Sequence, residues 1–434
     1  MKHYCWLEMN TFVLLMWAVN SHHLVRIPLE STDQLRFTGA AQIGSPPRSL
    51  RVVFDTGSSD TWVSSAFASA VDKAEAPTSF AIGYGGGVVS GLSSPIDLRL
   101  ANQLLLSHVH VGFVDDATSV LSDLDAQGVV GLGMEALAQI HTNSSVLGLL
   151  AKQHQIKPFV FSLYVSSWSG AKPASQLIIG GQDEALTSSN ATWFSFPIVP
   201  DSAFRTPQPS MQSVKDSFSF WALRVQSLVL DNVVLPLSRP NGRNGIALLD
   251  SGTSVLLLPP NIFDRVVQTL FTRFGTRLVA PSNREQALPA CRRCQVHEFP
   301  TLGFDFMGEN TKSAATSQRF ELRGSDYVRC DRRDCTTMID IIDSSEVSDR
   351  LVLVLGSVFF RAYYTRFDYS NKQASIACTL DHKGVCRGGL QPALDYHGQP
   401  YEPSGEMQQT NWTGLCVAVT ALALLAGFRF LLQH

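Results

Sequence analysis

Apolar residues along most of this chain occur in short runs separated by turn-forming residues. A representative stretch is residues 50–65, LRVVFDTGSSDTWVSS, where an apolar run ends in Asp, Gly and Ser. This pattern is typical of short β-strands joined by tight turns. Residues 259–275, PPNIFDRVVQTLFTRFG, differ because their apolar side chains recur at helical spacing. We expect a packing helix there, beginning near Pro and ending at Gly.

One strand–turn pattern occurs twice. Asp55 leads from an apolar run into Thr-Gly-Ser-Ser, and Asp250 does the same into Ser-Gly-Thr-Ser within residues 246–259, IALLDSGTSVLLLP. Two such matches arise by chance about once in a thousand chains of this length at average residue usage. Each acid is followed later by an apolar run ending in Gly, at residues 128–133 and 351–357. The repeat predicts two similar lobes that each present one acid on a tight loop.

Two acids that meet between such lobes have a definite chemistry. Because like charges repel at contact, the pair holds one proton. The ionised member can take a proton from a water that attacks a peptide carbonyl, while the protonated member donates to the carbonyl oxygen. Gly57 and Gly252 allow close approach of backbone N–H groups, and Ser58 and Thr253 offer hydroxyls to the acids. Turn capping, the commonest use of Asp before Gly, is the alternative.

These paired motifs closely resemble those of the pepsin-like aspartic proteases, and the similarity covers about residues 36–377. The resemblance implies a mainly β, bilobal fold, with two pseudo-two-fold-related β lobes and the active site in the cleft between them. It implies that Asp55 and Asp250 are the catalytic residues. It implies that six neighbours support the active site: Thr56, Gly57, Ser58, Ser251, Gly252 and Thr253. It also implies a flap at IGYGGGVVSG, with Tyr84 and Gly85 in the flap and Trp62 supporting it. The plain alternatives are a hairpin aromatic for Tyr84 and a core role for Trp62.

The resemblance implies an aspartic-type endopeptidase that hydrolyses peptide bonds in proteins at acid pH, without cofactor or metal. The alternative is a catalytically silent peptide- or protein-binding protein on the same fold. The chain departs from the family pattern in lacking any Cys between Cys5 and Cys291, and in having Ser357 where the family often has Asp. Residues 199–217 are expected to form an inserted surface loop.

Composition narrows the class of protein further. The 434 residues are 45% apolar, which suffices for two cores. Charged residues make up 16% and the net charge is −3, so no clustered basic face for nucleic acid is apparent. We expect a monomer that acts on protein or peptide substrates and has no nucleic-acid partner.

Six of the eight cysteines lie in the second half of the predicted catalytic region: Cys291, Cys294, Cys330, Cys335, Cys378 and Cys386. The stretches CRRC and CDRRDC are compatible with zinc, but behind a signal peptide disulfides are favoured. Six cysteines allow 15 pairings. We favour bridges between the first stretch and the second, with Cys378 and Cys386 closing a short loop.

The N-terminal region predicts entry into the secretory pathway. Residues 1–21 contain the short apolar core TFVLLMWAV and resemble a signal peptide. Residues 22–34 form a segment too short for an inhibitory prosegment spanning a cleft, so control by compartment pH or location is expected. Glycosylation candidates are Asn143, Asn190 and Asn411. The first strand is expected near Arg36, and the catalytic lobes at residues 35–195 and 196–386.

The C-terminal region predicts attachment to a membrane through a stalk, residues 387–413, and an apolar tail, residues 414–432. The tail is either a retained transmembrane helix or a removable glycolipid-anchor signal with attachment at Ser404 and Gly405. The missing cytoplasmic tail favours the glycolipid anchor, whereas Arg429 in the apolar run and Glu406 beside the attachment site count against it. We prefer the transmembrane helix and keep both alternatives open. The catalytic domain is expected to be lumenal or extracellular.

Overall fold

The structure is a computed structural model that describes residues 24–31, 35–70, 76–84, 87–101, 104–115, 124–153, 159–166, 173–187, 191–204, 217–237, 244–279, 288–308, 317–342, 351–379, 386 and 388–392. All of these belong to one compact unit formed by residues 1–309 and 317–401. The predicted signal peptide, Gly85, Asn190, Asn411, most of the stalk and the predicted anchor lie outside the described residues.

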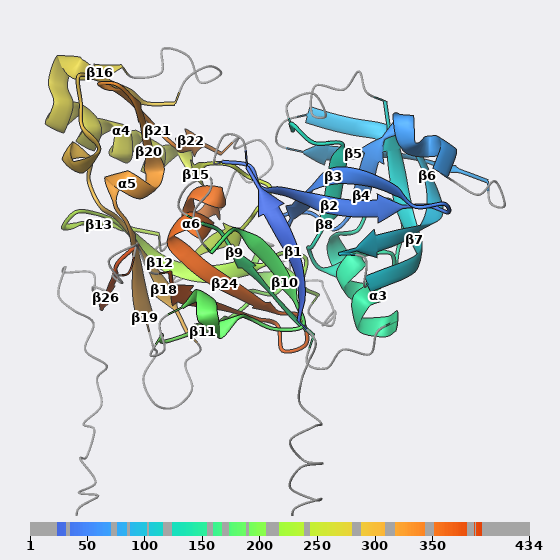
Figure 1. Ribbon diagram of the computed structural model, residues 1–434. Helices are drawn as coiled ribbons and strands as arrows, with labels where there is room; N and C mark the ends of the chain where they lie inside the picture. The colour runs from blue at the N-terminus through green and yellow to red at the C-terminus, as the bar shows by residue number, and fades with distance from the viewer. Residues whose placement is uncertain are drawn as a thin grey trace, which may run out of the picture. The chain divides into compact units, whose positions relative to one another are not determined.

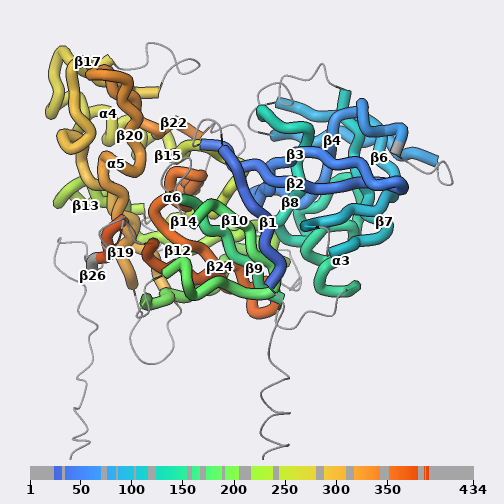
Figure 2. Tube along the Cα trace, in the orientation of Figure 1, coloured from blue at the N-terminus to red at the C-terminus, as the bar shows by residue number. Residues whose placement is uncertain are grey.

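The fold is mainly β, as predicted, and the largest sheet has thirteen strands among the described residues (Figure 1). Its order is β11-β25-β24-β9-β10-β1-β2-β3-β8-β4-β7-β6-β5. The strands are β1 (Val25–Glu30), β2 (Thr38–Ile43), β3 (Arg48–Asp55), β4 (Thr61–Ser64), β5 (Thr78–Tyr84), β6 (Gly87–Leu100), β7 (Leu104–Val114), β8 (Gly128–Gly131), β9 (Val160–Tyr164), β10 (Gln176–Ile179), β11 (Phe194–Pro197), β24 (Tyr363–Asp368) and β25 (Gln373–Cys378). The sheet therefore joins the first half of the chain to its last long hairpin (Figure 2).

A second sheet has nine strands in the order β22-β15-β23-β14-β12-β18-β19-β26, with β13 beside β12. They are β12 (Ala222–Leu230), β13 (Val233–Pro236), β14 (Gly245–Leu249), β15 (Leu256–Leu258), β18 (Leu302–Met307), β19 (Ser317–Leu322), β22 (Ile339–Ile341), β23 (Val352–Leu355) and β26 (Leu390–Pro392). A small third sheet contains β16 (Leu278–Val279), β17 (Ala290–Arg292), β20 (Val328–Asp331) and β21 (Asp334–Thr337).

The repeat seen in the sequence is also a repeat of strand pairing. The first acid-bearing strand, β3, lies parallel to β8, and the strand after its turn, β4, lies antiparallel to β8. In the same way β14 lies parallel to β23, and β15 lies antiparallel to β23. Both sets are buried apolar runs, as expected of strands covered on both faces. The two predicted similar lobes are thus confirmed.

The first strand begins earlier than the sequence predicted. Residues 25–30, VRIPLE, alternate buried and exposed side chains, with Ile27 pointing inward at 1% exposure. This strand pairs with β10 on one side and with β2 on the other, and Arg26 forms an ion pair of 2.7 Å with Asp183. The expectation of a first strand near Arg36 is wrong, because period-2 alternation already starts at Val25.

Helices are few among the described residues: α3 (Val146–Gln153), α4 (Pro260–Phe274), α5 (Gly324–Tyr327) and α6 (Ser357–Ala362), with short 3-10 turns η1 (Ser65–Ala70), η2 (Glu135–Leu137), η3 (Glu184–Leu186), η4 (Asp201–Phe204), η5 (Gly275–Arg277) and η6 (Val296–Glu298). The predicted packing helix is confirmed as α4, which follows Pro259 and stops at Gly275, where φ is 55°. Its inner face buries Ile262, Val266 and Leu270. No helix in the described part of the chain has the length and apolar character needed to cross a bilayer.

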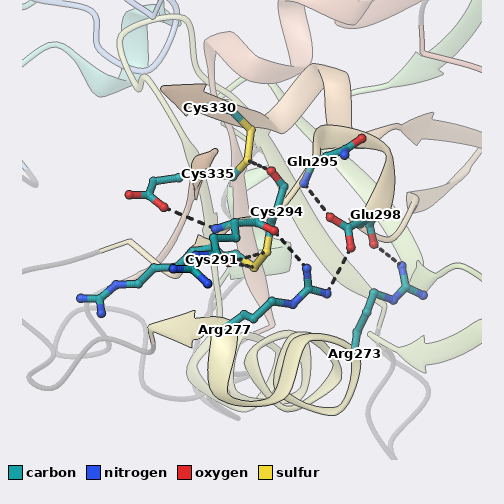
Figure 3. Close-up of a disulfide and its surroundings, with 11 residues drawn as sticks. Arg273, Arg277, Cys291, Cys294, Gln295, Glu298, Cys330 and Cys335 are labelled. Carbon is teal, nitrogen blue, oxygen red and sulfur yellow. Dashed lines mark hydrogen bonds and ion pairs between the residues drawn. A yellow bond between two sulfur atoms is a disulfide. The ribbon is translucent and has the colours of Figure 1, made fainter. Parts of the chain in front are cut away.

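Within the described residues, three disulfides close short loops: Cys291–Cys294, Cys330–Cys335 and Cys378–Cys386. The last pairing agrees with the prediction. The preference for bridges between the first two stretches is wrong: Cys291 bonds to Cys294 and Cys330 to Cys335, although the pairing of β17 with β21 also places Cys291 opposite Cys335. Figure 3 shows the two bridges beside one another.

Candidate active site

The first acid ends a buried strand. In β3 the run Val52–Val53–Phe54 is almost fully buried, and it carries Asp55, which is 8% exposed, into the turn. The Asp55 carboxylate accepts hydrogen bonds from the Gly57 N–H at 2.8 Å and from the Ser58 hydroxyl at 2.5 Å. A charged group buried at the end of a strand requires such donors.

The second acid is held in the same way. Asp250 directly follows β14, and its carboxylate accepts from the Gly252 N–H at 2.8 Å and from the Thr253 hydroxyl at 2.6 Å. The Thr253 N–H adds a third contact at 3.2 Å. The two loops therefore present their acids with equivalent partners, as the repeat predicted.

The two acids meet. Each acid lies against the turn that carries the other, with the Asp250 carboxyl beside Gly57 and the Asp55 carboxyl beside Gly252. The glycines explain how they come so close: a Cβ on Gly57 would lie 2.5 Å from Cγ of Asp250, and one on Gly252 would lie 2.4 Å from Oδ1 of Asp55. Any larger residue at either position would push the opposite acid away.

Two neighbouring side chains tie the loops together. The Thr56 hydroxyl donates to the Leu249 carbonyl at 2.8 Å and accepts from the Ser251 N–H at 2.9 Å. In return the Ser251 hydroxyl donates to the Phe54 carbonyl at 2.7 Å and accepts from the Thr56 N–H at 3.0 Å. Both side chains are buried. These reciprocal bonds fix the position of one acid relative to the other.

Burial changes the acidity of the pair. Desolvation, followed by the negative charge of Asp250, raises the pKa of the Asp55 carboxyl well above its usual range, against the lowering effect of the bonds from Ser58 and Gly57. The pair consequently retains a proton at pH values where an exposed aspartate has lost its own. A proton donor and a proton acceptor are thus present side by side.

The predicted flap residues lie beside this loop. Tyr84 ends β5, which pairs with β6 in an antiparallel hairpin. Trp62, 1% exposed in β4, donates from Nε1 to the Tyr84 hydroxyl at 2.8 Å. Burial and then the charge of Asp55 raise the pKa of the Tyr84 phenol, so it stays protonated. The structure brings Tyr84 and Trp62 together, whereas Gly85 is outside the described residues.

Sequence reasoning missed Asp60, a further acid on the first loop. Asp60 is 6% exposed, and its carboxylate accepts from the N–H groups of Gln139 and Ile140 at 2.8–3.0 Å. Burial raises the pKa of this carboxyl, although the two N–H bonds oppose the effect. Ile140 in turn packs in the cluster of apolar residues that contains Trp62. The available signal was an acid placed directly before the strand Thr61–Ser64, which is fully buried.

The remaining predicted positions lie outside this cluster of contacts. Ser357 begins α6, and its N–H donates to the Thr253 carbonyl at 2.8 Å, so it borders the second acid loop. Asn143 is exposed on a turn with φ 62°. No group of three or more His, Cys, Asp or Glu suited to a metal occurs in the described ranges.

Residues 36–379 match the family model for eukaryotic aspartyl proteases, so the chain belongs to that family. Gastricsin of Mus musculus is 25% identical over 362 residues, covering 79% of this chain and 80% of the relative. Chymosin of Callithrix jacchus is 26% identical over 374 residues (82% and 84%), and pepsin A of Rhinolophus ferrumequinum is 24% identical over 375 residues (81% and 83%). The predicted family and its mainly β, bilobal fold are confirmed.

Proposed function

We propose that this protein is an aspartic endopeptidase that cleaves peptide bonds in proteins at acid pH, using Asp55 and Asp250. The observation that carries the proposal is the close approach of these two carboxyl groups, Asp55 buried and Asp250 partly buried, each held by an equivalent N–H and hydroxyl. No cofactor is needed for this chemistry, and the substrate is a protein or peptide.

The pair acts as base and acid in one step. One carboxylate oxygen takes a proton from a water, which attacks the carbonyl carbon of the peptide bond, and the shared proton passes to the carbonyl oxygen. The proton taken from the water then passes to the amide nitrogen, the C–N bond breaks, and the other carboxylate takes a hydroxyl proton as the C=O bond re-forms, which restores the pair. The Ser58 and Thr253 hydroxyls keep the carboxyl groups in fixed orientations, so little reorganisation accompanies the proton transfers. Such acid–base steps contribute ~10²–10⁴-fold each.

The hairpin bearing Tyr84 serves as the cover of the site. A closing flap excludes water and positions the peptide over the acids. The bond from Trp62 fixes the Tyr84 ring at the end of β5, next to the turn of the hairpin, and Gly85 is the second residue proposed for the flap.

The test is cleavage of an unstructured protein at pH 4 and pH 7, with and without a statine-type peptide. We expect a bell-shaped pH profile with an acid optimum, complete inhibition by the statine peptide, and no cleavage by Asp250→Asn. Statine binding without cleavage by the wild type would instead support the silent binding protein. An optimum at or above pH 8 would contradict the shared proton.

We also propose that the protein acts as a monomer in the secretory pathway, attached to the membrane by residues 414–432 with its catalytic domain lumenal or extracellular. Three disulfides support an oxidising compartment. Treating intact cells with a phosphatidylinositol-specific phospholipase separates the two anchors. Release of protein indicates the glycolipid, whereas retention, with release on deletion of the residues after Gly414, indicates the helix.

A further inference from the structure

Two short disulfide loops each display a pair of arginines. The first is Cys291–Cys294, which encloses Arg292 and Arg293, and the second is Cys330–Cys335, which encloses Arg332 and Arg333. All four arginines are exposed. We name these four residues the arginine cluster.

The two loops lie against each other at one end of the small third sheet. Arg292 is the register partner of Asp334 in the pairing of β17 with β21. The Cys294 N–H donates to the Arg333 carbonyl at 2.9 Å, which joins the turns directly. Figure 3 shows the two disulfides adjacent to α4. The four charges consequently share one rigid base, although their segments are separated in the sequence.

The chain does not neutralise these side chains. Nearby, Arg273 pairs with Asp231, and Arg277 pairs with Glu298 at 3.1 Å. Within the described residues, none of the four guanidinium groups of the arginine cluster forms an ion pair or a side-chain hydrogen bond. Their hydrogen-bond donors face solvent and are open to an external partner.

Backbone conformation adds an independent argument. Arg293 and Arg332 both have φ of 56°, in the left-handed region. Gly, Asn or Asp occupies such turn positions at lower conformational cost than a long side chain does. Arginine at both turns is therefore unfavourable for the backbone, which indicates that the side chains themselves have a use.

The chemistry of the arginine cluster selects its partner. Guanidinium groups bind carboxylates through two parallel hydrogen bonds, and they stay charged at acid pH. Asp331 and Asp334 flank the second arginine pair and would repel a uniformly charged polyanion, such as a sulfated glycan or an anionic bilayer. A polypeptide segment with spaced acidic residues matches this mixed pattern of charges better.

We propose that the arginine cluster is a docking site, away from the catalytic acids in sequence, for an acidic stretch of the substrate polypeptide. This inference rests on the proposed protease function for its substrate, but its binding test does not. Docking raises the local concentration of the cleavable segment at the protease. It weakens as pH falls below about 4, where Glu and Asp carboxylates of the partner become protonated.

The first experiment measures binding to the Asp250→Asn protein, so that it does not depend on cleavage. The probe is a fluorescein-labelled peptide whose glutamates are spaced by neutral residues, followed by anisotropy at pH 5.5. We expect R293G/R332G in this background to bind at least about fivefold more weakly, since each exposed ion pair contributes modestly. Glycine relieves both left-handed turns, so this variant keeps or exceeds the parent melting temperature, and lost binding does not reflect unfolding.

The matched control is R224Q/R265Q, which removes two exposed arginines elsewhere and should bind the peptide as the parent does. Equal binding by R293G/R332G and the parent overturns the proposal, as does an equal loss in the control. Arginine-dependent binding of heparin oligosaccharides or phosphatidylserine vesicles in preference to the peptide also overturns it.

A second experiment uses the active protein and two substrates with one cleavage sequence, with or without an acidic tail. For the wild type, kcat/KM should be higher for the tailed substrate than for the untailed one, because the tailed substrate has the lower KM. In R293G/R332G the ratio of the two kcat/KM values should be about one. If neither substrate is cleaved while the peptide still binds, the protease function fails and the docking site stands.

Discussion

The two acid loops hold their carboxyl groups by the same bonds, but they lie in different surroundings. On both loops a glycine N–H and a hydroxyl two and three residues after the acid donate to it. The first loop continues to Asp60 and to the Trp62–Tyr84 pair. The second continues to β15 and borders Ser357, which brings no charge. Both lobes therefore supply one acid of the pair with the same donors, whereas Asp60 and the Trp62–Tyr84 contact lie on the first lobe.

The two acids, one from each lobe, predict the largest effect on activity. Asp55→Asn and Asp250→Asn should each reduce kcat for a peptide substrate by at least about 10²-fold, because either change removes a partner for the shared proton. Steady-state kinetics measures this, with circular dichroism as the control for folding. A single variant that keeps more than a per cent of the wild-type rate would rule out equal participation of the two acids.

The bonds between the loops predict equal effects from the two sides. Thr56→Ala strands the Leu249 carbonyl and the Ser251 N–H, and Ser251→Ala strands the Phe54 carbonyl and the Thr56 N–H. Each should lower the free energy of unfolding by about 1–3 kcal/mol, with strong non-additivity in the double variant. Urea denaturation tests this. A marked inequality between the single variants would show that one loop dominates.

The hairpin that carries Tyr84 gives a third prediction, which concerns the first lobe. Tyr84→Ala should lower turnover by about tenfold while the fold is kept, because the hairpin loses its contact with Trp62 and excludes water poorly. Tyr84→Phe keeps the ring and should have the smaller effect. Unchanged kcat and KM for Tyr84→Ala would place the flap elsewhere.

The smallest predicted effect concerns charge on the first loop. The raised pKa values of Asp55 and Asp60 mean that, above the usual Asp value of about 3.9, the folded state binds more protons than the unfolded state. The free energy of unfolding should consequently fall as pH rises from about 4 towards neutrality. Asp183, whose pKa the hydrogen bond from Arg26 lowers, loses its stabilising contribution only as pH falls below the usual Asp value, so it does not change this slope.

Urea denaturation at several pH values measures this slope, and Asp60→Asn should make it shallower. Asn retains one carbonyl oxygen to accept from the Gln139 or Ile140 N–H, so the comparison isolates the charge. A stability that increases steadily with pH over this range would contradict the assignment.

The acid loops and the β fold could be predicted because their signals are local. Each Asp–Gly turn and its flanking strands occupy one continuous stretch, and the stretch occurs twice. Residue type then predicted the groups that hold the acids, including the two hydroxyls that donate hydrogen bonds to them. The helix α4 was predictable for the same reason, since its apolar spacing and its Pro and Gly ends are contiguous.

Features that depend on long-range register were not predictable. The arginine cluster forms only because β17 pairs with β21, and no basic face is apparent when CRRC and CDRRDC are considered separately. The cysteine pairing was not predictable from register either, since Cys335 lies opposite both Cys291 and Cys330 and bonds to Cys330. Asp60 was missed because its partners, Gln139 and Ile140, lie far along the chain.

The position of β1 sets a limit on how the N-terminus can be trimmed during biosynthesis. Residues 25–30 fill a slot between β10 and β2, so cutting them off would expose hydrogen-bonding edges on both neighbours. Open edges recruit strands from other chains and lead to aggregation. A form that keeps this sheet intact consequently retains residues 25–30, so any cleavage at this end of the chain is expected before Val25.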